Sequence, residues 1–209
     1  MDDDLVEEVV GVAGRDLVLL RPRDAEALLS EEEFSHDEFL PYWAELWPSA
    51  TALARVVGAR ALRGAKTLEL GCGLGLVGLA AAAAGGRVTA TDWAPDSITL
   101  LERNAARNGL KLEGLCVDWA APEAIVARAP WDLVLASDVL YEARNGVALL
   151  PLLPRLIDAR GEIWLADPGR REAEPFLERA AEVFSVETRA AKEIRLGAIH
   201  RMRLKGSEA

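Results

Sequence analysis

The chain has 209 residues, 51% of them hydrophobic, and a formal net charge of −10. That length and composition fit one domain with a well-filled core. The acidic charge disfavours nucleic acid as a partner, because nucleic-acid affinity depends largely on neutralising phosphates. No apolar run approaches the roughly 20 residues needed to span a membrane.

The excess negative charge lies in the N-terminal fifth of the chain. Residues 1–40 hold thirteen Asp and Glu against three Arg, whereas residues 41–209 hold equal numbers of acids and bases. A solvated acidic face is one interpretation, and attraction of a partner with a basic surface is the other. The first ten residues are acidic where a signal peptide is basic. With only two, widely spaced cysteines, we expect a cytoplasmic protein.

We expect one domain over residues 1–209, with an N-terminal extension (1–48) and a Rossmann-like core (49–209). Two short strands around "AGRD" predict a β-hairpin over residues 5–20. An acidic helix over 23–34 is expected next, and then an aromatic loop, "LPYWAELWPSA". This loop leads into a helix predicted over residues 49–57.

From residue 66 onward, apolar strands alternate with amphipathic helices. Predicted strands cover residues 67–70, 87–91, 114–117, 131–137 and 162–166, and predicted helices cover 76–84, 95–108, 147–158 and 171–183. This alternation indicates an α/β, doubly wound fold, in which helices cover both faces of a mostly parallel sheet. The tail, from "FSVETR" to "HRMRLK", predicts two closing antiparallel strands.

The stretch "LELGCGLGLVG" over residues 68–78 places glycines at alternate positions between a strand and a helix. Glycine permits unusual backbone angles and lets a ligand touch the main chain. The helix N-terminus behind such a loop presents free N–H groups to an anion, and parallel sheets bind ligands at the carboxyl ends of their strands. The stretch therefore predicts a nucleotide-type ligand; a tight turn without a ligand is the alternative.

Acidic residues at the ends of three successive predicted strands favour S-adenosylmethionine. Glu69 could face the ammonium group of this ligand, which NAD lacks. Asp92 could bind the ribose diol, and Asp118 the adenine amino group, beside the rings of Trp93 and Trp119. Taken singly, each acid fits a helix cap equally well. The glycines also match the dinucleotide pattern GxGxxG, so an NAD(P)-dependent oxidoreductase stays an alternative.

Ordered blocks over residues 40–170 resemble those of the class I, seven-β-strand methyltransferases: "ELWPSA", "LELGCGLGLVGLAA", "VTATDW", "DW", "DLVLASDVLY" and "LADPGR". The Trp-Pro before the glycine motif and the Asp-x-x-Tyr after the fourth strand narrow this resemblance to methyltransferase family 16. Many members of that family are protein lysine N-methyltransferases. The resemblance implies a seven-stranded sheet ordered 3-2-1-4-5-7-6, with strand seven antiparallel.

The resemblance also implies site residues. Cofactor contacts carry over to Trp47, Gly71, Cys72, Gly73, Asp92, Trp119 and Ser137. Asp138 and Tyr141 match the Asp-x-x-Tyr motif on the substrate side. A carboxylate and a phenol at this place can orient an incoming amine, and the ring can face a cation. We therefore assign the orientation of the nucleophile to Asp138 and Tyr141; the alternative is that Asp138 caps a turn and Tyr141 packs in the core.

Together these observations predict an S-adenosylmethionine-dependent N-methyltransferase that transfers a methyl group in line to a lysine of a protein. The alternatives are a small-molecule N- or O-methyltransferase and an idle binding module of the same fold. Asp138 and Asp167, at neighbouring strand ends, also raise a metal-dependent O-methyltransferase. Because the Pro-Gly-Arg after Asp167 offers no further oxygen ligand, we expect no metal.

Overall fold

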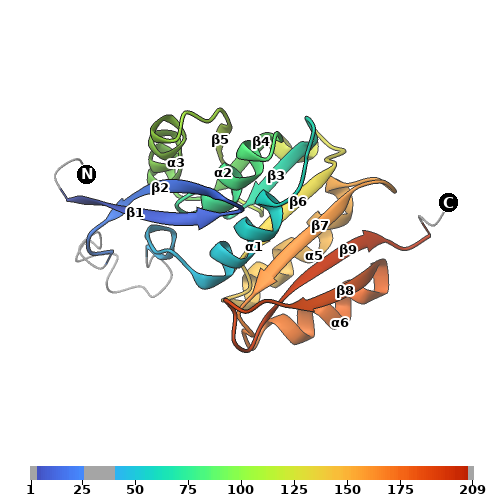
Figure 1. The fold of residues 1–209 in the computed structure, drawn as a ribbon. Coiled ribbons are helices and arrows are strands. Elements are labelled where there is room, and N and C mark those ends of the chain that lie inside the picture. Colours follow the sequence, from blue (N-terminus) through green and yellow to red (C-terminus); the bar gives the residue numbers. More distant parts are fainter. Residues whose placement is uncertain (1–3, 26–40, 207–209) are drawn as a thin grey trace.

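The computed structural model describes residues 4–25 and 41–206 (Figure 1). Within these residues, a seven-stranded sheet has the order β5-β4-β3-β6-β7-β9-β8, and β1 and β2 form a separate two-stranded sheet. The strands are β1 (Leu5–Val12), β2 (Arg15–Pro22), β3 (Lys66–Leu70), β4 (Arg87–Asp92), β5 (Glu113–Cys116), β6 (Leu133–Ser137), β7 (Glu162–Asp167), β8 (Phe184–Ala190) and β9 (Ala198–Leu204). The helices are the short 3-10 helix η4 (Tyr42–Ala44), α1 (Pro48–Gly58), α2 (Leu76–Ala83), α3 (Pro95–Arg107), α4 (Glu123–Val126), α5 (Ala143–Leu156) and α6 (Ala173–Val183).

The N-terminal hairpin forms as predicted. β1 pairs antiparallel with β2, and Val12 lies opposite Arg15 across the turn. Leu17 and Leu19 are buried, as alternation along a half-buried strand requires. The hairpin packs against α1, α2 and α3. Residues 26–34 of the predicted acidic helix lie outside the described residues.

The main sheet has the topology that the resemblance implies. β3 pairs in parallel with both β4 and β6, whereas β9 runs antiparallel to β7 and to β8. Counted from β3, the order is 3-2-1-4-5-7-6 with strand seven antiparallel, so this prediction is confirmed. The order reverses between β3 and β6, and the carboxyl ends of these strands point to the left in Figure 1. Such a reversal is where open α/β sheets bind ligands.

Two hydrophobic cores, one on each face, hold the sheet between its helices. Leu53 of α1 belongs to the core shared with α2, α3 and the hairpin. Leu156 of α5 belongs to the core shared with α4 and α6. Successive residues of β7 alternate between them: Trp164 enters the first core, while Ile163 and Leu165 enter the second. Burial on both faces explains why β6 and β7 are nearly continuously apolar in sequence.

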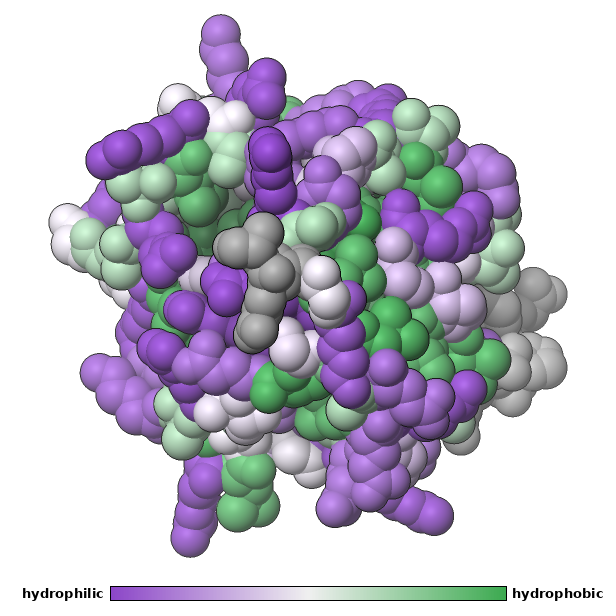
Figure 2. Space-filling view, turned by 90° about the vertical axis from the view of Figure 1, so that its right-hand side faces the viewer, coloured by the Kyte–Doolittle hydropathy of each residue, from purple (hydrophilic) through white to green (hydrophobic). Residues whose placement is uncertain are grey.

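The strands and helices predicted from residue 49 onward are confirmed, with shifted ends. α5 begins at Ala143, four residues before its predicted start at residue 147. The prediction began too late because Asn145 and Gly146 are poor helix formers, which weaken the helical signal in the sequence but do not interrupt the helix. The four-residue α4 is too short to show a periodicity, so it was not predicted. Among residues 4–25 and 41–206, no helix has the length and apolar character to cross a membrane. The side away from the carboxyl ends of the parallel strands carries mainly hydrophilic side chains, with small groups of hydrophobic ones between them (Figure 2).

Candidate active site

The glycine loop follows β3 and begins α2. Gly71, Gly73 and Gly75 have φ values of 66°, 50° and 83°, in the left-handed region that side chains disfavour. Space also disfavours a side chain at all three positions, most of all at Gly75, where a Cβ would lie 2.2 Å from Leu101. A Cβ on Gly71 would lie 3.0 Å from Val139, and one on Gly73 would lie 3.1 Å from the carbonyl oxygen of Trp43. The backbone of the loop therefore lies close to Val139, which follows β6, and to Trp43 of η4.

Asp92, at the end of β4, fixes this loop. Its Oδ2 accepts a hydrogen bond from the Gly73 amide at 2.9 Å, and its Oδ1 accepts one from the Ala94 amide at 3.1 Å. The side chain is nearly fully buried, and this burial raises the pKa of the carboxyl although the amides oppose it. Asp92 thus links the end of β4 to the glycine loop.

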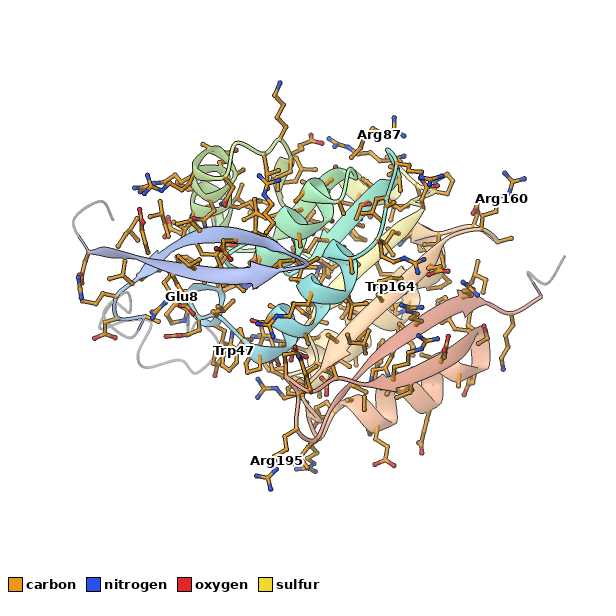
Figure 3. All side chains as sticks on the ribbon, in the orientation of Figure 1. Glu8, Trp47, Arg87, Arg160, Trp164 and Arg195 are labelled. Carbon is orange, nitrogen blue, oxygen red and sulfur yellow. The ribbon has the colours of Figure 1, made fainter. Side chains whose placement is uncertain are left out.

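A cleft of about 540 Å³ opens beyond the carboxyl ends of β3, β4 and β6. Its lining brings together all but one of the residues that the sequence predicts for the site: Trp47, Gly71, Cys72, Gly73, Asp92, Trp93, Asp118, Trp119, Ser137, Asp138 and Tyr141. Arg170, which the sequence places at the same mouth because it follows the fifth predicted strand, also lines the cleft. The cleft has further lining residues that sequence reasoning did not assign to it: Tyr42, Trp43, Glu45, Leu46 and Asn145. Trp47 lies at this end of the molecule, and Arg87 and Arg160 lie at the opposite end (Figure 3).

Glu69 is the predicted site residue that does not line the cleft. Its side chain is buried behind the loop, and a Cβ on Gly78 of α2 would lie 2.5 Å from its Oε2. Within the described residues, that oxygen has no hydrogen-bond partner. Burial raises the pKa of Glu69 to about 8, with Asp92 adding a smaller effect of the same sign. The Glu69 side chain therefore lies against α2, and its expected contact with a ligand ammonium stays a prediction.

An aromatic segment, residues 41–47, lines part of the cleft. The indole Nε1 of Trp47 donates a hydrogen bond to the carbonyl oxygen of Tyr42 at 2.9 Å. The ring of Tyr42 lies 5.2 Å from the ring of Tyr141, centroid to centroid, and is tilted against it. This tilted ring contact joins the aromatic segment to the loop after β6. The density of aromatic residues in "PYWAELW" was the signal that could have identified Tyr42 as a lining residue.

Asp138 follows β6 and holds the other end of the cleft. It is almost completely buried and has a φ of 56°, which is uncommon for a non-glycine residue and typical of functional positions. Its Oδ1 pairs with the Arg170 guanidinium at 2.8 Å, and its Oδ2 accepts a longer hydrogen bond, 3.3 Å, from Ser49 of α1. Burial raises the pKa of the nearby Tyr141 phenol, so that phenol stays protonated at neutral pH.

Other candidate groups have structural surroundings. Burial raises the pKa of the Cys72 thiol, which lies 3.7 Å from the hydroxyl of Ser97. His200 lies in β9, and its Nδ1 is 2.9 Å from the hydroxyl of Thr188. Among residues 4–25 and 41–206, no three His, Cys, Asp or Glu side chains are grouped so that they could hold a metal ion.

Comparison with known proteins agrees with this arrangement. The electron transfer flavoprotein beta subunit lysine methyltransferase of Xenopus laevis is 33% identical over 138 residues, which are 63% of this chain and 54% of that protein. The protein N-lysine methyltransferase METTL21A of Mus musculus is 31% identical over 173 residues, 73% of this chain and 75% of that protein. The chain thus spans about half the length of the first relative and three quarters of the second.

The fold also has close counterparts among solved structures. The 16S rRNA N2 G1207 methyltransferase of T. thermophilus, in complex with AdoMet and guanosine, superimposes with a TM-score of 0.72 at 18% identity. The superposition covers 97% of this chain and 51% of that one. A model of the lysine methyltransferase family matches residues 37–183, well over half of the sequence. The chain therefore belongs to the lysine methyltransferase family, methyltransferase family 16.

Proposed function

We propose that the protein is an S-adenosylmethionine-dependent N-methyltransferase that acts on a lysine side chain of a protein. One observation carries this proposal. In a chain of the lysine methyltransferase family, a single cleft joins a glycine loop and strand-end acids to a buried carboxylate, Asp138, and a phenol, Tyr141. The first set suits a nucleoside bearing an amino-acid group, and the second suits an amine acceptor.

The residues of the cleft fit this cofactor. Gly71 and Gly73 leave room for a ligand to approach main chain that a Cβ would block. Asp92 offers carboxylate oxygens beside the loop, and Trp93 and Trp119 offer ring surfaces near Asp118. We assign the ribose hydroxyls to Asp92 and the adenine to the Trp93–Trp119 side. When bound, S-adenosylmethionine would supply a methyl group on a positively charged sulfonium.

Asp138 and Tyr141 would orient the acceptor nitrogen. A lysine amine attacks only when neutral, and its usual pKa is ~10.4, so the acceptor nitrogen must lose a proton before the methyl transfer. The bond from Ser49 to Oδ2 of Asp138 is long at 3.3 Å, and an N–H of the acceptor can replace it. The protonated Tyr141 phenol can hold the same nitrogen. Correct alignment in a cleft that excludes water then supplies most of the catalysis.

The protein partner and the location are parts of this proposal. Three acids at the N-terminal hairpin are paired with arginines of this chain: Asp4 with Arg23, Glu7 with Arg107 and Glu8 with Arg21. Attraction of a basic partner surface would therefore depend on the other acids of the first 40 residues. The free thiol of the exposed Cys116 suits the reducing cytoplasm.

Two measurements test the function. Titration calorimetry should show binding of S-adenosylmethionine and none of NADH. Tritiated S-adenosylmethionine should label lysine in a protein band of a cell lysate, and Asp138→Asn should reduce the label by about a hundredfold because the acceptor loses its alignment. Asp16→Asn, at an exposed position of β2 in the hairpin, is the matched control. Label confined to small molecules, or equal labelling by Asp138→Asn, would contradict the proposal.

A further inference from the structure

Arg170 stands on a turn whose backbone is held firmly. Oδ1 of Asp167, the last residue of β7, accepts hydrogen bonds from the amides of Gly169 and Arg170, both at 2.7 Å. Gly169 has a φ of 91°, and a Cβ there would lie 2.7 Å from the carbonyl oxygen of Leu196. The turn is therefore closed on one side by the strand end and on the other by the β8–β9 connection.

The guanidinium of Arg170 reaches two parts of the cleft at once. Its Nε and Nη2 atoms both lie 2.8 Å from Oδ1 of Asp138. Its central carbon lies 5.4 Å from the ring centroid of Trp47, close enough for a cation–π contact. Asp138 is the residue proposed to orient the acceptor amine, and Trp47 belongs to the aromatic segment, residues 41–47. A planar guanidinium can pair with a carboxylate along its edge while its face lies on an aromatic ring, which a lysine ammonium cannot do.

The two contacts differ in their surroundings. The side chain of Asp138 is 4% exposed, whereas that of Arg170 is 35% exposed. A buried carboxylate keeps its partner in place strongly, because separation would leave a charge without compensation. The orientation of Arg170, and with it the contact with Trp47, therefore depends on Asp138.

We propose that Arg170 is a positioning residue that links Asp138, the carboxylate that orients the acceptor amine, to Trp47 of the aromatic segment. Through this link, the cofactor-binding half and the acceptor-binding half of the cleft are positioned relative to each other. This inference rests on the proposed function. It requires that a substitution at Asp138 lower the affinity for the cofactor, although Asp138 belongs to the acceptor half of the cleft. Trp47 keeps its hydrogen bond to Tyr42, so the effect is a weakening and not a loss.

Calorimetry with S-adenosylhomocysteine tests the tie without any acceptor. Arg170→Met and Asp138→Asn should each raise the Kd about three- to tenfold, the range of a cation–π contact. The Kd of the double variant, Arg170→Met with Asp138→Asn, should not exceed the larger of the two single-variant Kd values, because both changes break the same link. Asn tolerates the positive φ at residue 138, so the backbone there is preserved. Arg170→Lys should give an intermediate Kd, and Arg171→Met, the neighbouring exposed arginine, should bind like wild type.

Different results would overturn the inference. An unchanged Kd for Asp138→Asn would show that Trp47 does not depend on Asp138. Effects that multiply in the double variant would show two independent contacts. If Asp138→Asn unfolds, as judged by its thermal midpoint, Trp47→Leu replaces it: Arg170→Met should then add nothing in the Trp47→Leu background, and a further weakening would refute the tie. Failure of the proposed function is seen separately, as wild type that does not bind the nucleoside or does not label protein.

Discussion

The buried carboxyl of Glu69 predicts an unusual dependence of stability on pH. Its pKa is raised from 4.5 to about 8, first by burial and then by the charge of Asp92, while the Gly78 amide acts in the opposite direction. In the unfolded chain Glu69 ionises near pH 4.5, but in the folded protein it keeps its proton up to about pH 8. The folded state therefore holds more protons across this interval. Stability is fully present below the lower pKa and is lost as the pH rises through the upper one.

The size of the effect follows from the shift. Because the pKa of Glu69 is raised this far, its full ionisation lowers the free energy of unfolding by at most about 5 kcal/mol. Of this loss, about 3 kcal/mol occurs between about pH 5.5 and pH 9. Glu69→Gln has no such ionisation, although its amide adds a constant cost from burial. The informative quantity is therefore the change of the free energy of unfolding with pH, not its value at one pH.

Urea denaturation of both proteins at several pH values in this interval measures the effect. The difference in the free energy of unfolding, Glu69→Gln minus wild type, should rise with pH by about 3 kcal/mol. Asp92, whose pKa is also raised by burial, is present in both proteins, so most of its contribution cancels. Parallel curves for the two proteins would refute the reasoning, since they would show that Glu69 is solvated or paired with a positive charge in the folded state.

Two further predictions concern the framework around the cleft. Gly75→Ala should lower the free energy of unfolding by about 2 kcal/mol or more, because its φ is 83° and the new Cβ would lie 2.2 Å from Leu101. Gly14→Ala, with the same φ and open space around it, is the control in urea denaturation and should cost only about 1 kcal/mol; equal losses would contradict the contact with Leu101. Asn104→Leu should cost about 3 kcal/mol and loosen the hairpin, since the buried Asn104 amide bonds both the N–H and the C=O of Leu20. Hydrogen exchange at the Leu20 amide should rise sharply, and an unchanged rate would show that the hairpin is held without Asn104.

Local pattern was enough to predict most of the fold. The alternation of apolar strands with amphipathic helices after residue 66 has a physical cause: the central strands β3, β4, β6 and β7 are buried between two layers of helices, and helices such as α3 and α5 bury one face. The strand order was not contained in that alternation. It came from resemblance and is confirmed by the pairing of β3 with β4 and β6.

The site was predicted where its residues lie at strand ends, and missed where it depends on folding. Asp92, Asp118 and Asp138 each follow an apolar strand, so parallel pairing brings them to one edge. Tyr42 reaches the cleft only because its segment folds back over the glycine loop. Glu69 is the converse case: its place in the motif predicts a ligand contact, whereas only the structure shows that its side chain packs against α2 and does not line the cleft.

Sequence alone therefore determined the elements, the glycine loop and the edge of the sheet at which a ligand binds, because these follow from periodicity, from backbone freedom and from the direction of parallel strands. Only the tertiary structure decided which charges meet. Arg170 and Asp138 are far apart along the chain, and no local signal pairs them, but β6 and β7 lie side by side in the sheet and bring their ends within hydrogen-bond distance. Burial, which sets the pKa of Glu69 and the strength of the Asp138–Arg170 pair, is likewise a property of the packed molecule and not of any segment of it.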